Sequence, residues 1–224
     1  MNPALTFILL LISLFLLSRV LTSSLLMLLF RLTRSKRLAI GIFSFLFLPG
    51  TVIHEFSHAA TAQILGVYVG EMNLTPKIGE KDIQLGSVQI AESDPFRHFL
   101  IGVAPLIVGL FLIILNITIY SRLGLTGFLP AAVLFYILFQ IGNTMFSSSR
   151  DMEGAIELGI AVGLILGVVY FVWGTQPFIN ALSQLKHLDP FFKMATNSLV
   201  KIITVDIGII ILARILNSPL KISK

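Results

Sequence analysis

The first segment of the chain, from Pro3 to Phe30, is apolar apart from a few hydroxyl groups and one charged residue, Arg19. A transmembrane helix needs about 20 apolar residues, and this run exceeds that length. The run is also too long for the core of a signal peptide, and it lacks a basic start and a small-residue cleavage site. We therefore expect a first membrane-spanning helix that is retained.

The rest of the chain has the same character. Only 12% of the 224 residues are charged and 56% are hydrophobic, whereas a soluble domain carries roughly 25% charged residues. Apolar runs alternate with short polar connections, which predicts an all-α polytopic membrane protein with about six transmembrane helices. The expected spans are 3–30, 38–65, 99–120, 128–146, 154–173 and 199–216.

The distribution of charge and the absence of cysteine narrow the possible functions. The formal net charge of +5 comes from Lys and Arg residues at span ends rather than from a basic stripe, so we do not expect nucleic-acid binding. Without cysteine the chain has no thiol nucleophile and no thiolate ligand. A metal ion could be bound only through His, Asp or Glu.

Residues 66–98 form the longest polar segment. The run from Lys77 to Asp82 is typical of a turn, and residues 83–85 and 88–90 alternate apolar and polar around Gly86 and Ser87. We expect a short β-hairpin in this loop, lying at the membrane surface. Its edge at 83–90 could hold an extended substrate by strand addition.

Two of the four histidines occur in the motif H-E-x-x-H, which runs from His54 to His58. Residues four apart on an α-helix are turned by about 40° and separated by about 6 Å along the axis. Both imidazoles therefore project from one face and can bind one zinc ion. Glu55 can act as general base on a zinc-activated water and return the proton to the leaving amine as general acid. This spacing indicates a metalloprotease.

The motif lies inside the second apolar segment, where two His and a Glu would be costly without a function. The alternative is polar packing between helices. Pro49 and Gly50 precede the motif by one turn. They could break the span and admit water, or form a simple packing kink.

A catalytic zinc site needs a third protein ligand, for which a carboxylate is the expected source. The candidates are Asp151, Glu153, Glu157 and Asp206. Glu153 and Glu157 also suit the start of a helix, and Asp206, inside an apolar helix, could instead pair with Arg19. His98 and His187 lie at span ends, where histidine is ordinary, and we expect no metal role for them.

These motifs resemble the site-2 protease family of intramembrane zinc metalloproteases over residues 38–154. Asn143 precedes Asp151 by eight residues, which is the spacing of Asn and Asp in the family's third motif, although serines stand where prolines are common and Met152-Glu153 displace its glycine. The segment from Gly102 to Pro105 resembles the family's Gly-Pro motif, with Val108 in place of its Asn.

The resemblance implies a zinc metalloendopeptidase with one zinc ion per chain, bound by His54, His58 and Asp151. Glu55 would be catalytic, and Asn143 would hydrogen-bond the substrate backbone or steady the site. The alternative for Asn143 is a hydrogen bond between helices inside the bundle. The substrate would be a peptide bond in or next to a transmembrane segment of another membrane protein. The resemblance also implies a multi-pass location in the cell membrane.

The chain then divides into three parts. The first helix and a basic loop occupy 1–37, and the metalloprotease core occupies 38–154, with three transmembrane helices and a β-hairpin loop at 66–98. C-terminal transmembrane helices occupy 155–224. Two alternatives stay open: a membrane-surface zincin peptidase with another third ligand, such as Glu157, and a non-catalytic zinc-binding membrane scaffold.

Overall fold

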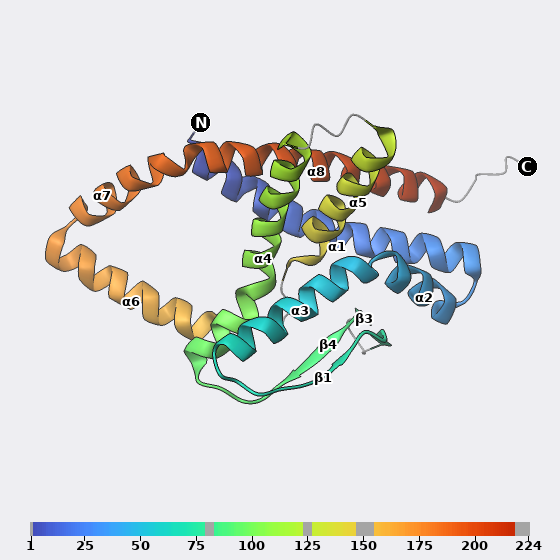
Figure 1. Cartoon of the computed structure of the whole chain (residues 1–224), viewed down its shortest axis with the longest axis horizontal. Coiled ribbons are helices and arrows are strands. Elements are labelled where there is room, and N and C mark those ends of the chain that lie inside the picture. The colour runs from blue at the N-terminus through green and yellow to red at the C-terminus, as the bar shows by residue number, and fades with distance from the viewer. Residues whose placement is uncertain (1, 79–82, 123–126, 147–154, 218–224) are drawn as a thin grey trace, which may run out of the picture.

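The computed structural model describes residues 2–78, 83–122, 127–146 and 155–217. The fold is helical apart from four short strands (Figure 1). The helices are α1 (Pro3–Thr33), α2 (Lys36–Leu46), α3 (Leu48–Ile64), α4 (Pro95–Arg122), α5 (Phe128–Thr144), α6 (Ala155–Trp173), α7 (Gln176–Gln184), the 3-10 turn η1 (Leu185–Leu188) and α8 (Asp189–Asn217). The strands are β1 (Val69–Asn73), β2 (Lys77–Ile78), β3 (Ile83–Gln84) and β4 (Ser87–Ile90).

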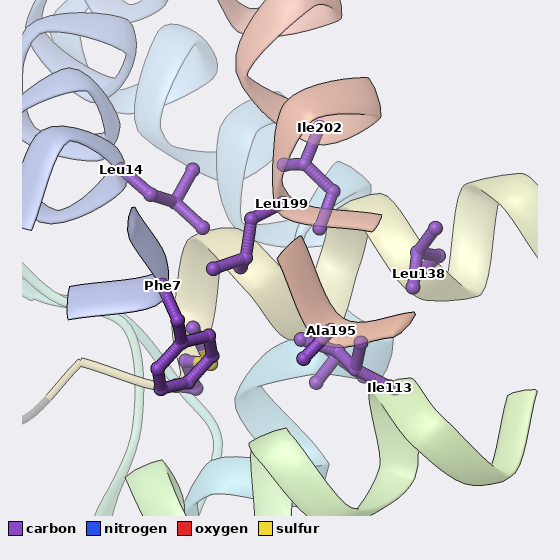
Figure 2. Close-up of a cluster of buried hydrophobic side chains, with 9 residues drawn as sticks. Phe7, Leu14, Ile113, Leu138, Ala195, Leu199 and Ile202 are labelled. Carbon is purple, nitrogen blue, oxygen red and sulfur yellow. The ribbon is translucent and has the colours of Figure 1, made fainter. Parts of the chain in front are cut away.

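The hydrophobic core lies where α1 and α8, side by side, meet α4 and α5 (Figure 1). Figure 2 shows the buried side chains at this junction. The labelled residues are Phe7, Leu14, Ile113, Leu138, Ala195, Leu199 and Ile202. Large apolar side chains also cover the outside of α1, α4 and α6. A surface of this kind suits lipid, because the backbone polar groups are satisfied within the helices.

Two of the described helices, α1 and α4, are long and apolar enough to cross a membrane. A third span is present if the bent pair α2 and α3 counts as one. This confirms the helical class predicted from composition, and the apolar helices are consistent with a membrane protein. Helices α5 and α6 lie where the fourth and fifth spans are expected, and the expected sixth lies within α8. Over the described residues none of these three helices is both long and apolar enough to count as a span.

The second apolar segment is broken at Phe47, where the axes of α2 and α3 are bent by 70°. Pro49 lies in the first turn of α3, where a missing N–H costs no helical hydrogen bond. The carbonyl of Leu46 accepts hydrogen bonds from the Tyr136 hydroxyl at 2.8 Å and from Gln140 Nε2 at 2.7 Å. Two side chains of α5 thus hold this break, which was one of the two possibilities expected for Pro49 and Gly50.

The strands predicted on either side of Gly86 and Ser87 are present, but they do not pair with each other. β3 pairs with β2, and β4 pairs with β1, both antiparallel. The hairpin is therefore longer than expected. Its two arms run from Val69 to Ile78 and from Ile83 to Ile90, and the predicted turn lies partly in 79–82, outside the described residues. Alternation of apolar and polar residues indicates that a segment is extended, but it does not indicate which strand the segment pairs with.

Candidate metal centre

The H-E-x-x-H motif lies in the middle of α3, as its spacing predicts. Glu55 and His58 are buried, with exposed fractions of 8% and 4%, and His54 is half-buried. The two imidazole rings lie edge to face, and their Nε2 atoms are 3.2 Å apart. One turn of helix thus brings both ring nitrogens to a common point.

The other nitrogen of each ring contacts a backbone carbonyl of a different helix. His54 Nδ1 lies 2.6 Å from the Thr144 oxygen of α5, and His58 Nδ1 lies 2.7 Å from the Ile101 oxygen of α4. A carbonyl only accepts, so each Nδ1 carries the proton and donates. In a neutral imidazole this leaves a lone pair on Nε2. The two lone pairs converge, which is the arrangement that a metal ion requires.

The Ile101 carbonyl is available because of Pro105. Within an α-helix the carbonyl of residue 101 would accept from the N–H of residue 105, and proline has no N–H. Pro105 lies inside α4 and is buried. His58 therefore donates to a carbonyl that the helix itself cannot satisfy. The predicted Gly-Pro segment thereby acquires a physical role in holding His58.

The Thr144 carbonyl is available for a different reason. Thr144 is the last residue of α5, and the final carbonyls of a helix have no partner within it. The helices approach closely here, because a Cβ atom added at Gly50 would lie 2.5 Å from Thr144 Oγ1. Gly50 thus permits the short distance between His54 and the end of α5.

The pair of histidines fits zinc. Tetrahedral zinc with bonds to nitrogen of about 2.0 Å places two ligand nitrogens about 3.3 Å apart. Zinc-bound histidines also commonly donate their other N–H to a backbone carbonyl, which orients the ring. The donor set and the second hydrogen bonds of His54 and His58 both match these requirements.

The third ligand is not identified among the described residues, since no further His, Asp or Glu in them joins the two histidines in a metal-binding group. Asp151 and Glu153 lie outside the described residues, and the side chain of Glu157 is likewise not described. His187 is exposed in η1. Asp151 as third ligand therefore stays a prediction.

Asp206 lies elsewhere, fully buried in α8. The sequence suggested pairing with Arg19, but this is wrong: Arg19 is exposed on α1, and its guanidinium lies 5.0 Å from the centre of the Phe15 ring. Asp206 Oδ1 instead accepts a hydrogen bond of 3.0 Å from Asn143 Nδ2.

The metal-motif residues face a cavity of about 830 Å³ between α3, the hairpin and the ends of α4 and α5. Its lining includes His54, Glu55, His58 and Asn143, so the structure brings these four predicted residues together. His98, for which we expected no metal role, also lines the cavity. The chain from Gln84 to Ser93 forms one wall.

Gly86 lies against the metal motif, which the sequence did not reveal. A Cβ atom added there would lie 2.9 Å from Glu55 Cγ and 3.1 Å from Glu55 Oε1. The backbone at the start of β4 therefore packs directly on the predicted base. In the sequence Gly86 indicated only a turn, and its contact with α3 requires the three-dimensional arrangement.

The role of Pro105 can be tested by substitution. We expect Pro105→Ala to lower zinc affinity by about tenfold or more, because the new N–H at residue 105 competes with His58 for the Ile101 carbonyl. Competition with a chromophoric chelator measures this affinity. Pro95→Ala, in the first turn of the same helix where no N–H is used, is the matched control. Equal affinity in both variants would contradict the role.

No protein-family model, curated protein or solved structure matches the chain.

Proposed function

We propose that the protein is an intramembrane zinc metalloendopeptidase of the site-2 protease type. The observation that supports this most strongly is the convergence of His54 Nε2 and His58 Nε2 at 3.2 Å, with each opposite Nδ1 bonded to a backbone carbonyl. Buried Glu55 beside this pair adds the general base that a hydrolase needs.

Each residue of the site has a distinct role in the proposal. His54 and His58 hold one zinc ion together with Asp151. When bound, zinc supplies Lewis-acid activation of a water molecule and of the scissile carbonyl. Glu55 takes a proton from the water as it attacks and delivers it to the leaving amine, so that the peptide bond is replaced by a carboxylate and an amine.

The substrate is a peptide bond in or next to a transmembrane segment of a membrane protein. A helix hides its carbonyls in internal hydrogen bonds, so the cleaved segment must be extended. In the described sheet β4 pairs with β1 alone, and the chain around β4 lines the cavity that contains Glu55. Both observations favour strand addition along β4 as the mode of substrate binding.

We further propose a multi-pass location in the cell membrane, with six spans and the hairpin at the membrane surface. The apolar exteriors of α1, α4 and α6 support this location. The chain has no native cysteine, so single cysteines introduced at Ser35 and Ser87 can be labelled without background. We expect labelling from opposite sides of the membrane, and labelling of both from one side would contradict six spans.

Metal removal tests the proposed function directly. Purified protein in liposomes is expected to contain one zinc ion per chain and to cleave a co-reconstituted single-span peptide. A chelator should abolish cleavage, because water is no longer activated once zinc is removed. Added zinc should restore cleavage. Metal analysis and product mass spectrometry measure the two quantities. His54→Ala should lose the zinc. Cleavage that persists without zinc would overturn the proposal.

A further inference from the structure

Asp206 is a buried acidic residue that the proposed chemistry does not use. Its exposed fraction is 0%. Oδ1 accepts from Asn143 Nδ2 at 3.0 Å, whereas Oδ2 has no hydrogen-bond partner among the described residues. A carboxylate in this position is expensive to retain unless it has a function. Asn143, which donates this hydrogen bond, lines the cavity of the metal centre.

The environment of the Asn143 amide fixes which way it points. Nδ2 donates both to Asp206 Oδ1 and to the Phe139 carbonyl, the latter at 3.1 Å. Both partners are acceptors, so only the NH₂ end of the amide can occupy this position. The carbonyl oxygen Oδ1 is left at the other end, buried and with no hydrogen-bond partner among the described residues.

Close packing of α5 against α8 makes this contact possible. A Cβ atom added at Gly142 would lie 2.6 Å from Ile202 Cδ1, so a larger residue there would require the Ile202 side chain to move. Ile202 lies one turn before Asp206 on α8, and Gly142 is next to Asn143 on α5. The hydrogen bond between Asn143 and Asp206 therefore lies beside a close contact of α5 with α8.

We propose that Asp206 is a positioning residue that fixes the Asn143 amide with its carbonyl oxygen as the acceptor for a backbone N–H of the substrate. This inference rests on the proposed function. Without Asp206 the amide would keep only the hydrogen bond from Nδ2 to the Phe139 carbonyl and would be held less firmly in this orientation. Asp206 would act through Asn143, because Asn143 lines the cavity whereas Asp206 is not among its lining residues.

Two substitutions of similar shape separate this role from packing. Asp206→Asn keeps an oxygen that can accept from Asn143, so we expect kcat/KM within about twofold of wild type. Asp206→Leu keeps the branched shape and removes every acceptor. We expect it to lower kcat/KM by about tenfold, mainly through KM, which corresponds to the loss of one hydrogen bond.

The double variant provides the decisive comparison. If Asp206 acts through Asn143, Asp206→Leu combined with Asn143→Ala should be no worse than Asn143→Ala alone. If the fold-losses in kcat/KM of the two single variants multiply in the double variant, Asp206 contributes through packing and the proposal is overturned. An Asp206→Asn variant as impaired as Asp206→Leu would also overturn it.

A second measurement does not depend on cleavage. The chain has seven asparagines, so asparagine-selective ¹⁵N labelling gives few side-chain NH₂ signals. Asn143→Ala identifies the signal of Asn143. We expect this signal to exchange slowly with solvent in the wild type and in Asp206→Asn. If the Asn143 signal of the wild type exchanges as fast as the signals of the exposed Asn73 and Asn197, the proposal is overturned. This result does not require Asp206→Leu to fold.

The two arms separate this inference from the proposed function. If the wild type and Glu55→Gln cleave the substrate at the same rate, or neither cleaves it, the proposed function fails. The NMR arm then still decides whether Asp206 fixes the Asn143 amide. If cleavage depends on Glu55 but the double variant shows multiplying losses, the inference fails and the proposed function stands.

Discussion

Glu55→Gln is expected to reduce peptide cleavage by at least about 100-fold while the protein keeps its zinc. General acid and base catalysis contributes roughly 10²–10⁴ in rate. Glutamine has nearly the same shape as glutamate but cannot take the proton of the attacking water. Because the histidines and their carbonyl partners are unchanged, zinc binding should persist. Single-turnover cleavage in liposomes and metal analysis of the same sample measure both effects.

The matched control is Glu71→Gln. Glu71 also has a carboxylate that lines the cavity, but it lies exposed on β1. It should cleave at close to the wild-type rate. The experiment also separates the proposed protease from a zinc-binding scaffold, which needs the two histidines but no base. Equal processing by the wild type and Glu55→Gln would refute the protease and leave the scaffold.

Gly86→Ala is expected to reduce cleavage by about 100-fold with zinc retained. The new methyl group would lie 2.9 Å from Glu55 Cγ and 2.9 Å from Thr51 Cγ2, closer than these atoms can approach. Either the Glu55 side chain or the start of β4 must move. A displacement of about 1 Å in a catalytic group can cost roughly 10²-fold in rate. Cleavage kinetics and zinc content together report the change.

Gly41→Ala is the matched control, since a Cβ atom at Gly41 would meet nothing within 4 Å. In the middle of α2 it should slightly stabilise the helix and leave cleavage unchanged. If Gly86→Ala cleaves as well as Gly41→Ala, the packing of β4 on Glu55 has no influence on the reaction.

The sequence predicted the local features of the site well. The H-E-x-x-H spacing, the break near Pro49 and the extended pieces around Gly86 all depend on neighbours in the chain, so their chemistry can be read from short segments. They appear in the structure as α3, the bend at Phe47 and strands β3 and β4.

The features that the sequence did not predict depend on residues far apart in the chain. The contact of Asn143 with Asp206 joins positions 63 residues apart. The partners of β3 and β4 depend on the whole hairpin, because alternation is the same for any pairing. The approach of Gly86 to Glu55 depends on where the hairpin packs against α3.

The two histidine rings are hydrogen-bonded to carbonyls on different helices, and this also affects the stability of the helical bundle. His54 belongs to α3 and contacts α5, whereas His58 contacts α4. An ion held between their Nε2 atoms therefore links three helices through two rings. A ligand that binds only the folded state adds its binding free energy to stability. We expect the melting temperature of the protein to rise with zinc, and Pro105→Ala to reduce that rise.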